Sequence, residues 1–226
     1  MTLCLVTDRR RLAGSEATPD AACRCLLDQV RHAVAAGVEL IQVRERDLGG
    51  AALSALVREV VRLTGGSDTR VVVNDRLDVA LACGADGVHL RGDSMSPADA
   101  RRLAPSGFLI GRSVHTVDEA VRAKGADYLV AGTVFLSASK PGRDDLLSAK
   151  GLESIVRAVR VPVLAIGGVT ADRIGEIAAA GAAGVAAIGM FMAANSTADG
   201  VQCRAIVLHD TVQSARRRFD SPKMAP

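Results

Sequence analysis

The chain has 226 residues, of which 49% are hydrophobic types, and a formal net charge of +3. This is enough apolar material for one sizeable core, so we expect a single domain over residues 1–220 and a disordered tail at 221–226. The small charge and the near absence of aromatic residues argue against a nucleic-acid partner. Apolar runs end well before the roughly 20 residues that a membrane span needs.

The five cysteines are an odd number at scattered positions, which is typical of reduced thiols in the cytoplasm. We therefore expect a cytoplasmic protein with no membrane partner.

Short apolar runs rich in β-branched residues alternate with segments of helical period along the whole chain. Continuous apolar runs of this kind predict parallel strands covered on both faces. The expected strands are Leu3–Thr7, Val38–Arg44, Arg70–Asn74, Gly87–Leu90, Leu109–Val114, Tyr128–Val134, Pro162–Ile166 and Gly184–Ile188. Eight such units in succession predict an α/β fold of the (βα)8 type, the TIM barrel.

Capping residues and glycines mark the ends of the expected helices. Thr18, Ser96, Thr116 and Thr170 each precede a proline or an acidic first turn, which is the pattern of a helix N-terminus. Gly-Ala or Gly-Ala-Asp then recurs before several strands, as expected for a helix C-cap followed by a tight turn. This regular punctuation favours the barrel over a doubly wound sheet.

The second expected strand carries three polar side chains toward the mouth of the barrel. Gln42, Arg44 and Arg46 share one face, because they alternate along the strand with Ile41, Val43 and Glu45. An unpaired guanidinium is expensive to bury, so Arg44 must meet either a carboxylate or an anionic ligand. Both alternatives are open, with Glu45, Asp75 and Asp93 as the candidate carboxylates.

Asn74 and Asp75 end the third expected strand at the same mouth. An amide can orient a polar heterocycle, and a carboxylate can hold a metal ion or another strand's arginine. The same pair also fits an ordinary helix N-cap.

The fifth expected strand ends in Gly111-Arg112-Ser113-Val114-His115, where alternation places Ser113 and His115 on one face. Active sites of this architecture lie at the C-terminal ends of the strands, so His115 is a candidate proton donor and acceptor near neutral pH. His89, at the end of the fourth strand, is expected to be a hydrogen-bonded core histidine instead.

Two later segments predict a phosphate site. Ser137, Ser139 and Lys140 lie on a long loop after the sixth strand, where Lys140 would suit phosphate as a mobile charge, unless the loop is merely hydrophilic. Backbone amides can bind phosphate after strands seven and eight, where the expected residues are Gly167, Gly168, Ile188 and Gly189.

Taken in chain order, six motifs resemble the thiamine phosphate synthase and thiazole tautomerase superfamily over nearly the whole chain. They are Gln42-Val43-Arg44-Glu45-Arg46, Val73-Asn74-Asp75-Arg76, Asp86-Gly87-Val88-His89-Leu90, Ser113-Val114-His115, Ser137–Lys140 and Ala165-Ile166-Gly167-Gly168-Val169. The resemblance implies a TIM barrel that acts on a small-molecule thiazole phosphate in thiamine biosynthesis. A homo-oligomer is left open.

The synthase branch joins a pyrimidine diphosphate to thiazole phosphate with the help of Mg²⁺. This branch would assign Asp75 to the metal and the substrate contacts to Gln42, Arg44, Asn74, Ser113, Ser137, Ser139 and Lys140. The chain departs from the branch's pattern at two positions. Arg46 stands where a lysine belongs, and Ser94 stands where the second metal-binding aspartate belongs, with Asp93 one residue early.

The tautomerase branch is favoured by Arg44-Glu45-Arg46, Ser94-Met95-Ser96-Pro97 and Gly111–His115. It aromatises a dihydrothiazole carboxylate phosphate to carboxythiazole phosphate by proton transfer and needs no cofactor. The resemblance therefore predicts an isomerase with His115 as acid–base, Arg44 on the carboxylate and glycine amides on the phosphate. A thiamine phosphate synthase and a non-catalytic thiazole-phosphate-binding regulator are the alternatives.

Overall fold

The computed structural model describes residues 1–136, 146–192 and 202–221, and the side chains of 202–207 are left out. The predicted contacts Ser137, Ser139 and Lys140 and most of the predicted tail lie outside the described residues. The boundaries of the single domain stay a prediction.

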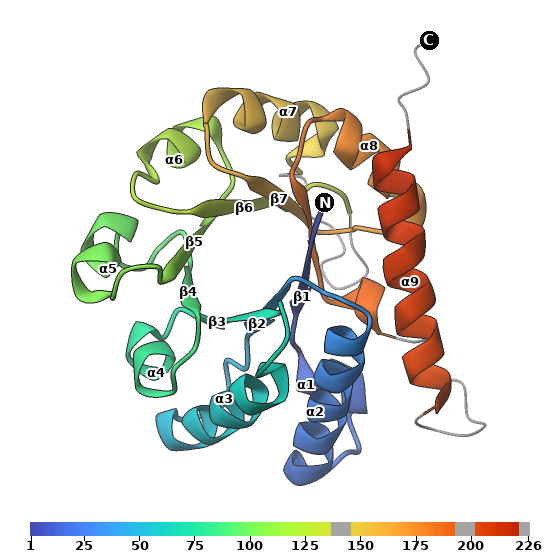
Figure 1. Ribbon diagram of the computed structural model, residues 1–226. Coiled ribbons are helices and arrows are strands. Elements are labelled where there is room, and N and C mark those ends of the chain that lie inside the picture. Colours follow the sequence, from blue (N-terminus) through green and yellow to red (C-terminus); the bar gives the residue numbers. More distant parts are fainter. Residues whose placement is uncertain (137–145, 193–201, 222–226) are drawn as a thin grey trace.

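Eight parallel strands close into a barrel in which each strand pairs with the next and β8 pairs with β1 (Figure 1). They are β1 (Thr2–Val6), β2 (Leu40–Val43), β3 (Arg70–Asn74), β4 (Gly87–Leu90), β5 (Leu109–Val114), β6 (Tyr128–Gly132), β7 (Val163–Ile166) and β8 (Gly184–Ala187). The predicted TIM barrel is confirmed. Several strands are shorter than predicted because ladder pairing ends before the apolar run does, and Arg44 lies just beyond β2.

Helices surround the barrel (Figure 1). They are α1 (Arg9–Ala13), α2 (Pro19–Ala35), α3 (Gly50–Thr64), α4 (Leu77–Ala82), α5 (Pro97–Leu103), α6 (Val117–Arg122), α7 (Ser148–Ala158), α8 (Ile174–Ala179) and α9 (Gln202–Asp220), with short 3₁₀ turns η1 (Ala171–Arg173) and η2 (Gly189–Phe191). The C-terminal helix α9 contacts both α2 and α8 and so joins the first part of the ring to the last. No helix in the described part of the chain is long and apolar enough to cross a membrane.

The predicted capping residues fall into two groups. The side chains of Thr18, Ser96 and Thr116 each accept a hydrogen bond from a backbone N–H in the first turn of α2, α5 and α6. Thr170 makes no such bond, because the chain enters the 3₁₀ turn η1 there before α8 begins.

Two apolar layers build the core. The outer layer lies between strands and helices, whereas the barrel interior is filled by Cys4, Val6, Leu40, Val72, Tyr128, Val130, Leu164 and Ala186. Gly111 belongs to this interior, and a Cβ there would lie only 2.2 Å from the Tyr128 ring and 2.6 Å from His89. The missing side chain therefore makes room for His89 and Tyr128 to meet. A filled interior restricts ligands to the mouth at the strands' C-terminal ends.

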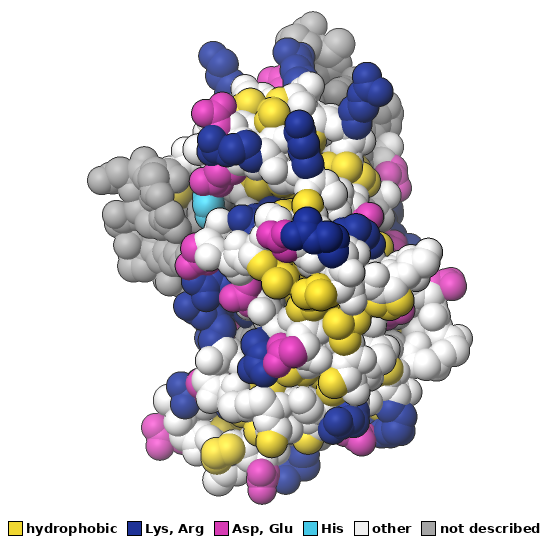
Figure 2. Space-filling view, turned by 90° about the vertical axis from the view of Figure 1, so that its left-hand side faces the viewer, with side chains coloured by type: hydrophobic (Ala, Val, Ile, Leu, Met, Phe, Trp, Pro, Cys, Tyr) yellow, Lys and Arg dark blue, Asp and Glu magenta, His cyan; other side chains and the backbone are white. Residues whose placement is uncertain are grey.

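The outer face over α5 and its neighbours mixes charged and apolar side chains. Lys and Arg are interspersed with Asp and Glu across this face (Figure 2). Exposed apolar side chains of α4 to α6 include Leu81, Leu103 and Val121.

Candidate active site

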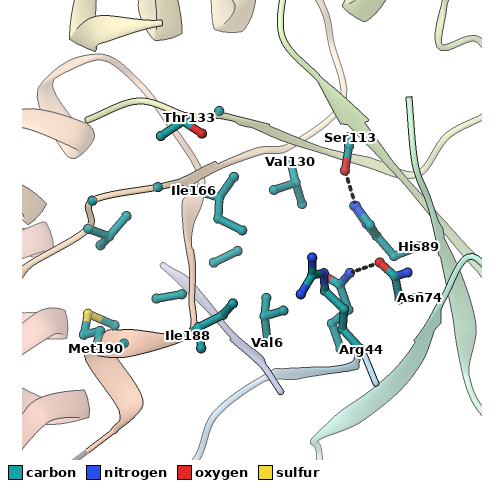
Figure 3. Close-up of a pocket in the computed structure, with 18 of the residues that line it drawn as sticks. Val6, Arg44, Asn74, His89, Ser113, Val130, Thr133, Ile166, Ile188 and Met190 are labelled. Atoms are coloured by element: carbon teal, nitrogen blue, oxygen red, sulfur yellow. Dashed lines mark hydrogen bonds between the residues drawn. The ribbon is translucent and has the colours of Figure 1, made fainter. Parts of the chain in front are cut away.

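A cavity of about 1190 Å³ opens at the C-terminal ends of the strands. The predicted residues that line it are Gln42, Arg44, Arg46, Asn74, Ser113, His115, Gly167, Gly168, Ile188 and Gly189, and Figure 3 shows several of them around a common space. Residues from strands at opposite sides of the barrel are thus brought together. Asp75 is not among the lining residues, although its neighbour Asn74 is.

Two hydrogen-bonded groups form the floor of the cavity. The amide nitrogen of Gln42 donates to Asn74 Oδ1 at 2.9 Å. His89 lies 2.8 Å from the Ser113 hydroxyl through Nε2 and 3.3 Å from the Tyr128 hydroxyl through Nδ1 (Figure 3 shows the contact with Ser113). His89 is buried as predicted, and Tyr128 is a partner that the sequence did not reveal.

The imidazole of His89 stays neutral. Burial, helped by the charge of Arg112, lowers the pKa of His89 to about 3. A neutral ring carries one N–H, so one of its two contacts is accepted from a hydroxyl. The floor is therefore polar and uncharged, and its histidine fixes the Ser113 side chain.

Arg44 is half-buried at the mouth and makes no ion pair with any described residue. Burial, followed by the neighbouring charge of Arg46, lowers the pKa of Arg44. Of its three candidate carboxylates, Glu45 pairs with Arg9, while Asp75 and Asp93 face Arg91. The guanidinium of Arg44 is thus left for an anionic ligand.

A buried ion network lies beside Arg44. Glu45 accepts hydrogen bonds from the Thr7 hydroxyl at 2.7 Å and from Arg9 Nη1 at 2.9 Å, and Arg9 also binds Asp47 at 2.6 Å. Burial raises the pKa of Glu45 against the effect of these bonds, whereas the Arg9 guanidinium lowers the pKa of Asp47. The Thr7 oxygen also accepts from the Arg44 backbone N–H at 2.9 Å. The network therefore fixes the position of the backbone at Arg44.

A second charged cluster joins the ends of β3 and β4. Arg91 Nη1 lies 3.6 Å from Asp75 Oδ2, and Arg91 Nη2 binds Asp93. The Asp75 backbone has φ +61°, a left-handed conformation, and its buried Oδ1 has no hydrogen-bond partner. No group of three metal-ligating side chains occurs in the described ranges.

This cluster does not fit the predicted Mg²⁺ site as it stands. Mg²⁺ demands near-ideal octahedral geometry from its oxygen ligands. Both candidate carboxylates, Asp75 and Asp93, instead face the guanidinium of Arg91, and Asp93 points largely into solvent with 69% of its side chain exposed.

The opposite side of the cavity is built from backbone. Gly167 and Gly168 follow β7 with φ +97° and +61°. A Cβ on Gly168 would lie 2.5 Å from the Leu136 carbonyl oxygen, so only glycine fits. Gly189 begins η2, where the first N–H groups have no partner within the helix. Such amides can bind phosphate.

Arg11 and Arg173 line the cavity beside these glycines, although the sequence did not single them out. Arg173 lies with its guanidinium 4.6 Å from the centre of the Phe135 ring. Arg11 belongs to the Arg9-Arg10-Arg11 run that begins α1, and two residues separate this run from the end of β1. Its position beyond a strand's C-terminal end was the signal in the sequence.

His115 lies at the exposed rim of the cavity. Its Nδ1 contacts the Gly132 carbonyl oxygen, and its backbone N–H donates to Glu119 at 2.6 Å. Ser113, two residues earlier, contacts the buried His89 at the floor. The two residues predicted to share one face therefore both line the cavity, but Ser113 lies at its floor and His115 at its rim.

Comparison with known proteins gives a consistent result. Residues 15–191 match the family described as thiamine monophosphate synthase. The chain is 46% identical over 160 residues to the thiamine-phosphate synthase of Methanoregula boonei, covering 70% of this chain and 74% of that protein. It is 33% identical over 211 residues to the thiamine-phosphate synthase of Chlorobium luteolum, covering 92% and 93%.

A solved structure agrees. Thiamine phosphate pyrophosphorylase from Pyrococcus furiosus superimposes with a TM-score of 0.75 at 33% identity, covering 95% of this chain and 96% of that one. A 3-hexulose-6-phosphate synthase, at 21% identity and a TM-score of 0.61, shares the fold.

These comparisons overturn the tautomerase prediction. The expected isomerase, with His115 as acid–base, is wrong, because the relatives that cover most of the chain are synthases. The strand-five motif that favoured it has another use in this structure, since it directs Ser113 to the buried His89.

Proposed function

Since the chain belongs to the thiamine monophosphate synthase family, we propose that it is a thiamine-phosphate synthase. This transferase joins hydroxymethylpyrimidine diphosphate to thiazole phosphate and releases diphosphate. The observation that carries the proposal is a cavity with an unpaired guanidinium, Arg44, on one side and glycine backbone on the other. Two anionic groups and a polar ring between them fit this arrangement.

The diphosphate binds on the side of Arg44 and Arg46. A guanidinium presents a planar fork of donors that matches phosphate oxygens. Arg44 forms no ion pair with a carboxylate among the described residues, so no existing pair has to break when the ligand binds. The ligand supplies the negative charge that a half-buried arginine needs.

The thiazole phosphate binds on the glycine side. Backbone amides at Gly168 and Gly189 approach its phosphate closely, and Arg11 and Arg173 add positive charge at the rim. The pyrimidine lies over the floor, where Gln42, Asn74 and the Ser113 hydroxyl offer donors and acceptors.

In the transfer step, the bond between the pyrimidine methylene carbon and the diphosphate oxygen breaks, and its electron pair leaves with the diphosphate. The thiazole nitrogen then supplies the pair for the new carbon–nitrogen bond. Arg44 stabilises the charge that grows on the leaving group, and such preorganised donors are a main source of rate acceleration. The neutral floor leaves the developing pyrimidine cation without a repelling histidine charge.

Purified protein mixed with both substrates and Mg²⁺ tests the proposal. We expect thiamine phosphate and diphosphate in equal amounts, measured by chromatography and a coupled diphosphate assay. An authentic synthase run in parallel is the control for reagents. Absence of product beside an active control would refute the proposed function.

A further inference from the structure

A guanidinium lies between the two carboxylates from which the sequence predicts a metal site. Arg91 Nη1 is 3.6 Å from Asp75 Oδ2, and Arg91 Nη2 binds Asp93. Asp75 follows β3, whereas Arg91 and Asp93 follow β4. Arg91 therefore places a fixed positive charge where neighbouring strand ends meet.

The loop that carries Arg91 is held in place by its own hydrogen bonds. The Ser94 backbone N–H and hydroxyl donate to the Arg91 carbonyl at 3.2 and 3.1 Å. Arg112 donates to the carbonyls of Gly92 at 2.8 Å, Ser94 at 3.3 Å and Met95 at 2.8 Å. Five hydrogen bonds thus fix the backbone around Arg91.

Arg91 also faces the cavity. It lines the same space as Arg44 and Arg46, with 44% of its side chain exposed. Its charge adds to burial and to Arg46 in lowering the pKa of Arg44. A guanidinium has five N–H donors, and its two carboxylate contacts leave others for a ligand.

We propose that Arg91 is a resident cation that binds the diphosphate of the substrate directly, in place of a Mg²⁺ ion held by Asp75 and Asp93. The inference rests on the proposed function for the identity of the substrate. A planar guanidinium suits two phosphate oxygens at once. Mg²⁺ would have to displace Arg91 from both carboxylates before they could coordinate it.

The test is the affinity for inorganic diphosphate, measured by isothermal titration calorimetry in EDTA and again with Mg²⁺. The variants are Arg91→Met and Arg91→Lys, with thermal unfolding as the check that each one folds. Arg76→Met is the matched control. Arg76 lies next to Asp75 and pairs with Asp78 at 2.6 Å with similar exposure, yet it does not line the cavity.

We expect the unmodified chain and Arg76→Met to bind diphosphate in EDTA. Arg91→Met should bind about tenfold more weakly, the effect of losing a charged hydrogen bond, and should regain affinity when Mg²⁺ is added, because Asp75 and Asp93 are then free. Arg91→Lys keeps the positive charge but lacks the paired donors of the guanidinium. If Arg91→Met does not fold, Arg91→Lys is compared with the unmodified chain in EDTA and with Mg²⁺ instead. Diphosphate binding by the unmodified chain that requires Mg²⁺, or that Arg91→Met leaves unchanged in EDTA, overturns the proposal.

This outcome is separable from that of the synthase assay, because binding of inorganic diphosphate needs no turnover. If thiamine phosphate forms but diphosphate binding requires Mg²⁺, the proposed role of Arg91 is wrong and the proposed synthase function is supported. If the unmodified chain binds diphosphate without metal, Arg91→Met loses this binding, and no thiamine phosphate forms, the role of Arg91 is supported and the proposed synthase function is wrong.

Discussion

The two sides of the cavity offer positive charge in different ways. The charged side, formed by Arg44, Arg46 and Arg91 after β2 and β4, uses guanidinium side chains. The glycine side, formed by Gly167, Gly168 and Gly189 after β7 and β8, uses backbone N–H groups, with arginines only at its rim. Both suit an anion, but they differ in what they cost the folded state.

On the charged side the cost is electrostatic. Arg44 is half-buried without an ion pair among the described residues, and burial lowers its pKa. On the glycine side the cost is conformational, because positive φ angles and close backbone contacts exclude any side chain. The charged side should therefore tolerate changes of side-chain shape but not the loss of a charge. The glycine side should tolerate changes of charge nearby but not an added side chain.

The largest expected effect comes from Arg44→Met. It removes the charge that balances the leaving diphosphate, so kcat/KM should fall by about 100-fold. The free energy of unfolding should stay the same or rise by about 1 kcal/mol, because an unpaired half-buried charge is replaced by an apolar side chain of similar length. Steady-state kinetics and urea unfolding measure the two effects.

Arg62→Met is the control for Arg44→Met. Arg62 is an exposed arginine of α3 that pairs with Glu59 at 2.9 Å and does not line the cavity. Its loss should change kcat/KM by less than about twofold, since Arg62 does not reach the cavity, and should change stability little, since exposed ion pairs contribute little. A large loss of stability in Arg44→Met with activity preserved would show that Arg44 is structural, and the contrast between the two sides would fail.

A smaller effect is expected from Gly168→Ala on the glycine side. An alanine at φ +61° is strained, and its Cβ would meet two carbonyl oxygens at 2.5 and 2.6 Å. We expect unfolding to become easier by about 2 kcal/mol. The KM for thiazole phosphate should rise about tenfold as the amide moves, while the KM for the pyrimidine diphosphate should change much less.

Gly175→Ala provides the matched comparison. Gly175 lies in α8, and an added Cβ there would meet nothing within 4 Å. This substitution should stabilise the protein by about 0.5–1 kcal/mol, the usual gain from replacing a helical glycine, and leave both KM values unchanged. If Gly168→Ala stabilised the protein and left both KM values unchanged, as Gly175→Ala should, the glycine side would not depend on the absence of a side chain.

The same contrast explains what the sequence could predict. Strand periodicity and capping patterns identified the barrel, and alternation correctly sent Gln42, Arg44 and Ser113 to the mouth. Gly167, Gly168 and Gly189 were visible as a phosphate-binding signal because of where they lie, since barrels commonly bind phosphate through backbone amides after strands seven and eight.

Contacts between loops were not visible in the same way. Arg9 meets Glu45 only because β1 lies in register with β2, and Arg91 reaches Asp75 only because their strands are neighbours. Alternation shows which face a side chain is on but not which partner from another loop it meets, so the sequence left Glu45 open as a partner of Arg44 and did not reveal its pairing with Arg9. The branch of the superfamily was mistaken for a similar reason, because short motifs such as Gly111–His115 do not specify which residue reaches the floor.

The smallest effect concerns the floor between the two sides, which should stay uncharged across the acidic range. His89 has a folded-state pKa of about 3, whereas an unfolded histidine titrates near 6.5. Between these values the unfolded chain binds one more proton than the folded chain. Stability from this group is therefore present above about pH 6.5 and is lost as the pH falls, by about 1.4 kcal/mol per pH unit.

Urea unfolding at pH 5.5 and 4.5 measures this loss. His89→Gln should lower stability at both values and remove about 1.4 kcal/mol of the difference between them, since glutamine does not titrate. His209→Gln, on the exposed face of α9, should keep the difference seen in the unmodified chain. An unchanged difference in His89→Gln would mean that His89 is protonated in the folded state. The floor would then carry a positive charge of its own, and the separation into a charged side and a glycine side across a neutral floor would no longer hold.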